Sequence, residues 1–223
     1  MGKYPTITEV RDNTIIDILK KADKTTLYLF LRGEGQFVGK FSEKKRVEIW
    51  NKFRQIEPEK KILLDNLDFS KLNLVKIDLR KTNLKQTNFE KANLEEANLE
   101  NTNFIQTNLR RANLTYARLL KARLIQTDLE NAILKYANLR KASLTEAKLK
   151  KADLEEADLE STFILGTNFE KANLQGAILR YARLINADLT NANLEGTDIS
   201  EANFTDTIVK GTSLEGKNIP GTI

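Results

Sequence analysis

Large apolar side chains recur at every fifth position over most of this 223-residue chain. From Phe69 to Ile219, each of these positions holds Leu, Phe, Ile or Val, without a break in register. Two residues before them, every position from Thr82 to Thr212 is Ala or Thr. We call the large apolar residue the centre of its five-residue unit and count the other positions from it. Residues 1–60 lack this pattern.

Neither regular secondary structure accommodates a period of five. An α-helix turns about 100° per residue, so successive centres would spiral around it. A straight strand alternates its faces with period two, so successive centres would alternate sides. A chain that turns a corner after each unit keeps every centre inside. Four units then close a coil of about 20 residues, and about eight coils stack at the inter-strand spacing of about 4.8 Å. The sequence predicts a β-solenoid over residues 61–223.

The individual units carry a recognisable motif. Two of them are Ala92-Asn93-Leu94-Glu95-Glu96 and Ala152-Asp153-Leu154-Glu155-Glu156. This motif resembles the pentapeptide-repeat family, whose units follow the pattern Ala-(Asp/Asn)-Leu-X-X, and the resemblance covers about residues 62–219. It implies a right-handed quadrilateral β-helix. The Asn/Asp position departs from the pattern at Arg118, Arg123, Ile133, Ser143, Lys148, Phe163, Ile178, Arg183 and Ile208. These positions lie outside the expected core, so they alter the surface and not the fold.

Centres that are 20 residues apart should stack on one another inside the solenoid. One such core ladder is Phe69, Phe89, Leu109, Leu129, Leu149, Phe169 and Leu189. Burial of each Leu contributes roughly 1.5–3 kcal/mol. The residues at centre −2 should be small because the corners are crowded.

Residues 1–60 are expected to form a small α/β domain. Thr6 and Glu9 form a candidate capping box before a helix that contains Ile15 and Leu19. The run 25–31 (TTLYLFL) and the segment 36–41 read as two strands, and Ser42 as the start of a second helix. The domain either caps the first coil or is a separate recognition module.

One side of the predicted solenoid carries an apolar row at centre +1. Its members are Ile105, Ile125, Leu165 and Ile185, with Phe163 beside them. A contiguous exposed apolar row is a candidate partner-binding face. The alternative is a ladder of side chains that only stabilises the stacking of coils.

Charged residues also fall into columns. Basic columns are expected from Lys71, Lys91, Arg111, Lys151 and Lys171, and from Arg80, Arg140 and Arg180. Such columns could meet phosphates. The alternative is a solvated surface with ion pairs that contribute little.

Composition narrows the function. The chain carries 36 Lys and Arg against 31 Asp and Glu, and it has no His and no Cys. The commonest general base and the commonest metal ligands are therefore missing, and we expect neither an enzyme nor a cofactor. No apolar run reaches the roughly 20 residues that span a bilayer, and nothing marks the chain for secretion, so we expect a cytoplasmic protein. The family resemblance favours a bacterial origin.

Three functions remain open. The first is a non-catalytic protein–protein interaction scaffold or regulator. The second, implied by the resemblance, is a DNA mimic that binds a type II topoisomerase such as gyrase. Against it, residues 61–223 carry a net charge of only +1, with 23 basic and 22 acidic residues. The third is direct nucleic-acid binding through the basic columns. Pro220 ends the repeat and, because it has no backbone N–H, blunts the edge of the last coil. This edge could still pair with a second copy, giving a homodimer through the C-terminal end.

Overall fold

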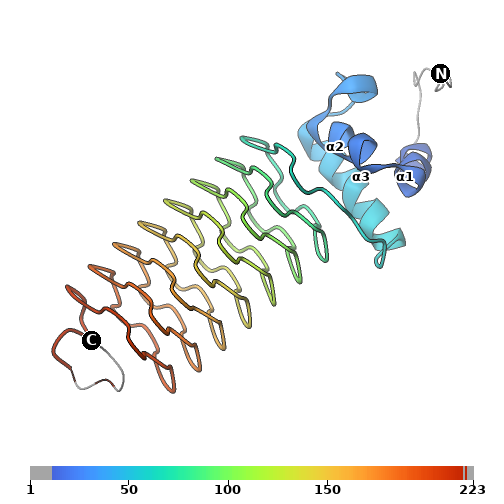
Figure 1. The fold of residues 1–223 in the computed structure, drawn as a ribbon. Coiled ribbons are helices and arrows are strands. Elements are labelled where there is room, and N and C mark those ends of the chain that lie inside the picture. Colours follow the sequence, from blue (N-terminus) through green and yellow to red (C-terminus); the bar gives the residue numbers. More distant parts are fainter. Residues whose placement is uncertain (1–11, 218, 220–223) are drawn as a thin grey trace. The chain divides into compact units, whose positions relative to one another are not determined.

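The computed structural model describes residues 12–217 and 219 of the chain. The chain divides into two compact units, Met1–Lys60 and Lys61–Ile223 (Figure 1). The first is helical and the second is a stack of coils, and each is described by itself.

The first unit contains three α-helices and a 3-10 turn within its described residues. They are α1 (Asp12–Lys21), α2 (Lys24–Arg32), η1 (Gly35–Phe37) and α3 (Glu43–Ile56). Helix α3 begins at the predicted cap, since the Ser42 side chain accepts a hydrogen bond from the backbone N–H of Lys45. The core of the unit is aromatic: Phe30, Phe37, Trp50 and Phe53 are fully buried. The candidate capping box at Thr6 and Glu9 lies outside the described residues.

The expected strands of this unit are wrong. The run 25–31 lies in α2, and segment 36–41 consists of η1 and turns. Asp23 caps the start of α2 through its bond from the N–H of Thr26, and Gly33 ends the helix with a left-handed φ of 70°. Between them Leu27, Phe30 and Leu31 are buried at helical spacing, so tertiary packing overrides strand propensity.

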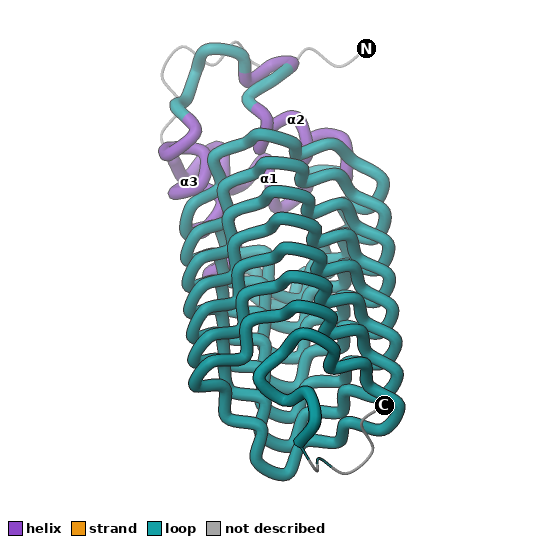
Figure 2. The backbone as a smooth tube through the Cα atoms, turned by 90° about the vertical axis from the view of Figure 1, so that its left-hand side faces the viewer, coloured by secondary structure: helices purple, strands orange, loops and turns teal. Residues whose placement is uncertain are grey.

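The second unit is a continuous stack of coils, as Figure 2 shows. Parallel bridges join residues 20 positions apart, from Leu63↔Asn83 to Asp188↔Ile208. Every bridge is isolated, so the described residues contain no longer strand. A corner after every five residues leaves one bridge residue on each side of a coil, which explains how a β-solenoid forms without extended strands.

One unit illustrates the bonds between coils. The N–H of Leu94 donates to the carbonyl of Asn113 at 2.7 Å, and the N–H of Asn113 donates to the carbonyl of Ala92 at 3.0 Å. At the corner, the N–H of Glu96 donates to the carbonyl of Thr115 at 2.9 Å. Each unit therefore donates two backbone N–H groups to the next coil, and one of its backbone carbonyls accepts a hydrogen bond from that coil.

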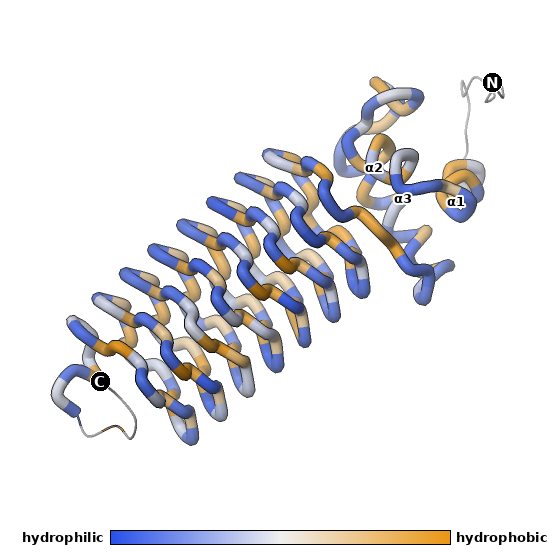
Figure 3. Tube along the Cα trace, viewed as in Figure 1, coloured by the Kyte–Doolittle hydropathy of each residue, from blue (hydrophilic) through white to orange (hydrophobic). Residues whose placement is uncertain are grey.

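The centres fill the interior. The members of the core ladder are all at most 1% exposed. The rings of Phe69 and Phe89 stack with centroids 5.2 Å apart. Successive coils repeat the same alternation of hydrophobic and hydrophilic residues (Figure 3).

The buried Thr residues at centre −2 have a specific role. The hydroxyl of Thr107 donates to the carbonyl of Leu84 at 2.7 Å, and that of Thr127 donates to Phe104 at 2.7 Å. Each acceptor lies 23 residues earlier, in the preceding coil. A small side chain that is either apolar or satisfied by this bond fits the position, which explains the alternation of Ala and Thr.

The last coil has free backbone donors. The N–H groups of Leu194, Ile199, Phe204 and Val209 donate to no acceptor among the described residues, although the same groups in earlier coils bond to the next coil. Pro220 lies outside the described residues. The free edge is compatible with the homodimer, which stays a prediction.

Candidate functional site

The apolar row lies along one side of the coil stack. We call this side, with its positions at centre −1 and centre +1, the apolar face. Ile105, Ile125, Leu165 and Ile185 are half-buried, and Thr145 continues the row between them. The row predicted as exposed is thus exposed only in part, and its positions follow one another from coil to coil at intervals of 20 residues. Phe163 alone among the five predicted residues is exposed, at 43%.

The centre −1 side chains flank the row on the same face. The hydroxyls of Ser143 and Thr145 lie 3.3 Å apart, which places the two positions side by side. The guanidinium of Arg183 lies over the ring of Phe163, 5.7 Å from its centroid. This flank therefore combines an exposed aromatic ring with a cation that stacks on it.

An amide ladder follows the corner at the other edge of the apolar face. The side-chain amide of Gln106 donates to Gln126 at 3.1 Å, and Gln126 donates to the Glu146 carboxylate at 2.8 Å. The two edges of the row thus differ in chemistry.

Most charged residues at centre +1 on the other sides pair with the next coil. Arg110 contacts Glu130 at 2.6 Å, and Lys150 contacts Glu170 at 2.6 Å. Lys135 contacts Glu155 at 2.7 Å. Each pair joins residues 20 apart, a spacing visible in the sequence that columns of one sign do not show.

These contacts shift the titration of the paired groups. The bond to Glu155 and then that to Asp153 raise the pKa of Lys135 to about 12. The bond from Lys150, followed by that from Lys171, lowers the pKa of the Glu170 carboxyl.

The predicted basic columns are not uniform. Arg140 binds Glu160 at 2.7 Å and Asp158 at 3.4 Å. Weaker or local contacts join Arg80 to Asp78, Arg180 to Asp198, Lys91 to Glu90 and Lys171 to Glu170. Lys71, Arg111 and Lys151 are exposed and have no ion pair among the described residues. The column of Arg80, Arg140 and Arg180 is therefore paired with acids, whereas the other column alternates paired and unpaired cations, and neither is a uniform phosphate-binding track.

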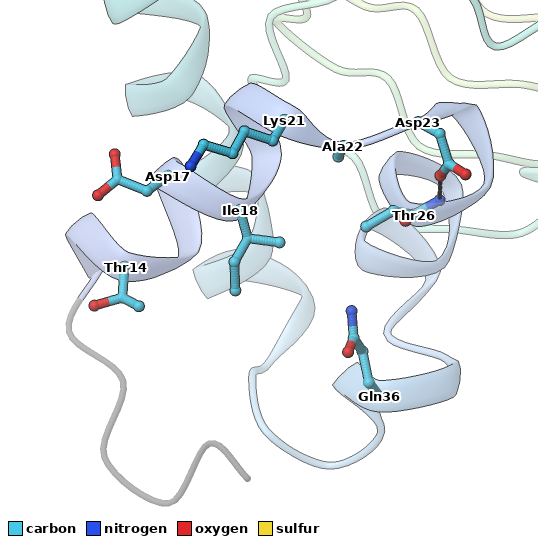
Figure 4. Close-up of a pocket in the computed structure, with 8 residues that line it drawn as sticks. All are labelled: Thr14, Asp17, Ile18, Lys21, Ala22, Asp23, Thr26 and Gln36. Atoms are coloured by element: carbon cyan, nitrogen blue, oxygen red, sulfur yellow. Dashed lines mark hydrogen bonds between the residues drawn. The ribbon is translucent and has the colours of Figure 1, made fainter. Parts of the chain in front are cut away.

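A pocket lies in the helical unit between α1 and the start of α2 (Figure 4). It is lined by Thr14, Asp17, Ile18, Lys21, Ala22, Asp23, Thr26 and Gln36. The Asp23 carboxylate in its wall accepts the N–H of Thr26 at 2.7 Å, and this bond lowers its pKa. Asp23 therefore acts as a helix cap, and we assign the pocket no chemistry.

Within the described residues, no three or more Asp, Glu, His or Cys side chains form a group that could hold a metal ion. In the same residues no helix combines the length and the apolar character needed to cross a membrane.

Comparison with known families identifies the coil unit. The sequence model for pentapeptide repeats (8 copies) matches residues 63–101, 92–131, 122–160 and 166–216. The chain belongs to the pentapeptide-repeat family. Pentapeptide-repeat proteins form right-handed quadrilateral β-helices, in agreement with the 20-residue spacing of the bridges.

Several solved structures are similar to this pentapeptide-repeat chain. HetL from the cyanobacterium Nostoc sp. strain PCC 7120, involved in heterocyst differentiation regulation, is 27% identical over 72% of this chain and 94% of its own, with a TM-score of 0.23. The plasmid-mediated fluoroquinolone resistance protein QnrB1 is 18% identical over 73% and 87%, with a TM-score of 0.35. A protein of the Arabidopsis thaliana thylakoid lumen is 29% identical over 52% and 63%, with a TM-score of 0.28. No curated protein sequence matches the chain.

Proposed function

We propose that this chain is a non-catalytic protein-interaction module, a scaffold or regulator, that binds another protein along its apolar face. The observation that carries the proposal is the row Ile105, Ile125, Leu165 and Ile185, which remains half-exposed together with the exposed ring of Phe163. A bound partner would bury this aligned apolar surface. Its burial would favour binding in proportion to the apolar area removed from water.

Two further considerations support an interaction role. Pentapeptide-repeat proteins are in general structural and interaction proteins rather than enzymes. The chain also lacks His and Cys, which supply the commonest general base and thiol nucleophile.

The coil surface supports this function better than the two alternatives. A DNA mimic that binds gyrase requires a strongly acidic surface, whereas here Glu130, Glu155 and Glu170 are paired with cations. Five members of the basic columns that direct nucleic-acid binding would use also contact carboxylates, namely Arg80, Lys91, Arg140, Lys171 and Arg180. A capping role for residues 1–60, the C-terminal homodimer, the bacterial origin and the cytoplasmic location stay predictions.

The direct test is recovery of a partner from native lysate with three baits. The first is the intact protein, and the second carries Thr at Ile105, Ile125, Leu165 and Ile185, because Thr145 already occupies this row. The third is a matched control with Leu120→Thr and Val75→Thr, which are half-buried centre +1 residues on other sides. We expect one protein to be recovered with the first and third baits and lost with the second.

Two outcomes would contradict the proposal. One is recovery of the same partner with the second bait, provided that thermal unfolding of that bait matches that of the intact protein. The other is recovery of no partner with any bait.

A further inference from the structure

Five cations lie on the apolar face or at its corner, where they border the apolar row. They are Lys85, Lys121, Arg123, Lys141 and Arg183. All five are exposed, and none has an ion pair among the described residues. Arg123 and Arg183 stand at centre −1, whereas Lys121 and Lys141 occupy the corner two residues before that position.

Acids are scarce on this face, and Glu100 and Glu160, which stand just before its corner, are held by Arg118 and Arg140. Across the surface positions of this face and its two corners, within the described residues 81–186, Glu146 is the one acid. It stands at the opposite corner and accepts the amide of Gln126 at 2.8 Å. Cations at centre +1 on other sides, such as Arg110, Arg140 and Lys150, instead meet a Glu one coil further along.

Like charges are also close together at this edge. Lys121 and Lys141 occupy the same corner of adjacent coils, so their backbones are separated by about 4.8 Å. Their mutual repulsion would be relieved by an external anion, and an apolar strip beside such an anion-binding edge complements an acidic partner that is apolar on one side.

We propose that the apolar face binds an acidic amphipathic helix of a partner protein. Its apolar stripe lies on the row, and its carboxylates meet Arg123, Arg183 and the two corner lysines. This inference rests on the proposed function and specifies the chemistry of the partner.

The dimensions of the row support a helix. From Ile105 to Ile185 the row crosses four coil spacings, or about 19 Å. A helix of about 13 residues has this length at 1.5 Å per residue, and its apolar side chains recur every 5.4 Å, close to the 4.8 Å coil spacing. An extended segment would alternate its side chains between two faces, so its acids would point away when its apolar residues face the row.

A nucleic acid fits this face less well. The row is aliphatic, and the two exposed aromatic side chains beside it, Phe163 and the corner residue Tyr181, do not form a series along the coils. Single strands are bound through series of stacked aromatic rings, and duplexes through phosphate contacts that leave an aliphatic row without a partner.

The test uses the purified full chain and three fluorescein-labelled probes. The first is a 15-residue helical peptide with a Leu stripe at positions i, i+3, i+4 and i+7, flanked by Glu. The second replaces each Glu by Lys, and the third is a 15-base-pair DNA duplex. Binding is measured by fluorescence anisotropy at two salt concentrations.

We expect the acidic peptide to bind, more weakly at the higher salt, and more tightly than the other two probes. The double variant Arg123→Glu and Arg183→Glu should weaken its binding about tenfold. The control Arg111→Glu and Lys151→Glu makes the same charge change on another side and should alter binding less than about twofold.

The inference is overturned if the acidic peptide does not bind, if the basic peptide or the duplex binds as tightly, or if both double variants weaken binding equally. If the peptide experiment fails but the second bait, with Thr in the apolar row, still loses its partner, only this inference falls and the proposed function stands. If that second bait keeps its partner, the proposed function is refuted even when the acidic peptide binds.

Discussion

The corner residue of each unit, two positions after the centre, adopts a left-handed backbone conformation. Its φ lies between 53° and 63° at every described non-glycine corner from Asn66 to Asp206. None of these corners holds Val, Ile or Thr, the residues for which this conformation is most strained. The N–H of the corner donates to the next coil, as from Asn131 to the carbonyl of Lys150 at 3.1 Å, and this bond holds the conformation.

Substitution of a corner residue should reveal this constraint. Asn131→Val places a β-branched residue at a φ of 57° and should lower the free energy of unfolding by about 1–2 kcal/mol. Asn131→Gly keeps the left-handed conformation accessible and should change the free energy of unfolding by less than about 1 kcal/mol. Urea unfolding followed by far-ultraviolet circular dichroism measures both variants. An equal loss in the two would contradict a conformational origin.

Among the elements, helix α3 is tied to the end of α2 by one buried cation. Arg46 is 7% exposed, and its guanidinium donates to the carbonyl of Leu31 at 3.1 Å and to that of Phe41 at 2.7 Å. Burial lowers the pKa of Arg46, and Glu43 partly offsets the effect. These bonds satisfy two carbonyls that no regular secondary structure would otherwise pair.

Removal of the Arg46 donors should destabilise the helical unit selectively. Arg46→Met keeps much of the volume but leaves both carbonyls unsatisfied, at a cost of about 1–3 kcal/mol. Trp50 is the single Trp of the chain and is fully buried in α3, so its fluorescence reports the unfolding of this unit. Lys44→Met changes an exposed residue of the same helix and should leave the transition in place. If the unfolding transition of the Trp50 fluorescence is the same in Arg46→Met as in the unchanged protein, the two carbonyls find other donors and the prediction is wrong.

The same unit shows where prediction from sequence fails. Ser42 identified the start of α3 because its side chain bonds locally. The aromatic and apolar content of the run 25–31 predicts a strand, but such content is a weak preference. The spacing of Leu27, Phe30 and Leu31, with Asp23 before and Gly33 after, already indicated a helix. Local caps and spacing were the better evidence.

For the molecule as a whole, the period of five determined which residues are inside and which share a column. The core ladder followed from it because a one-residue slip would expose every centre. The pairing of charges does not follow from the period, because it depends on which side chains meet across neighbouring coils. Arg110 reaches both Asp128 and Glu130, whereas Lys121 and Arg123 have no acid one coil further along. A count of cations by column therefore does not separate Arg140, which is paired with Glu160, from Lys121 and Lys141 beside it, which have no ion pair among the described residues.

Site-specific photocrosslinking tests the binding role of the apolar face most directly. A photoreactive amino acid at Thr145 sits in the middle of the row and leaves Ile105, Ile125, Leu165 and Ile185 intact. The control position is Thr115, which is also a half-buried centre +1 residue but lies on another side. We expect irradiation of cells to give one discrete adduct with a second protein from position 145 and none from position 115. No adduct from position 145, or equal adducts from both positions, would contradict the account.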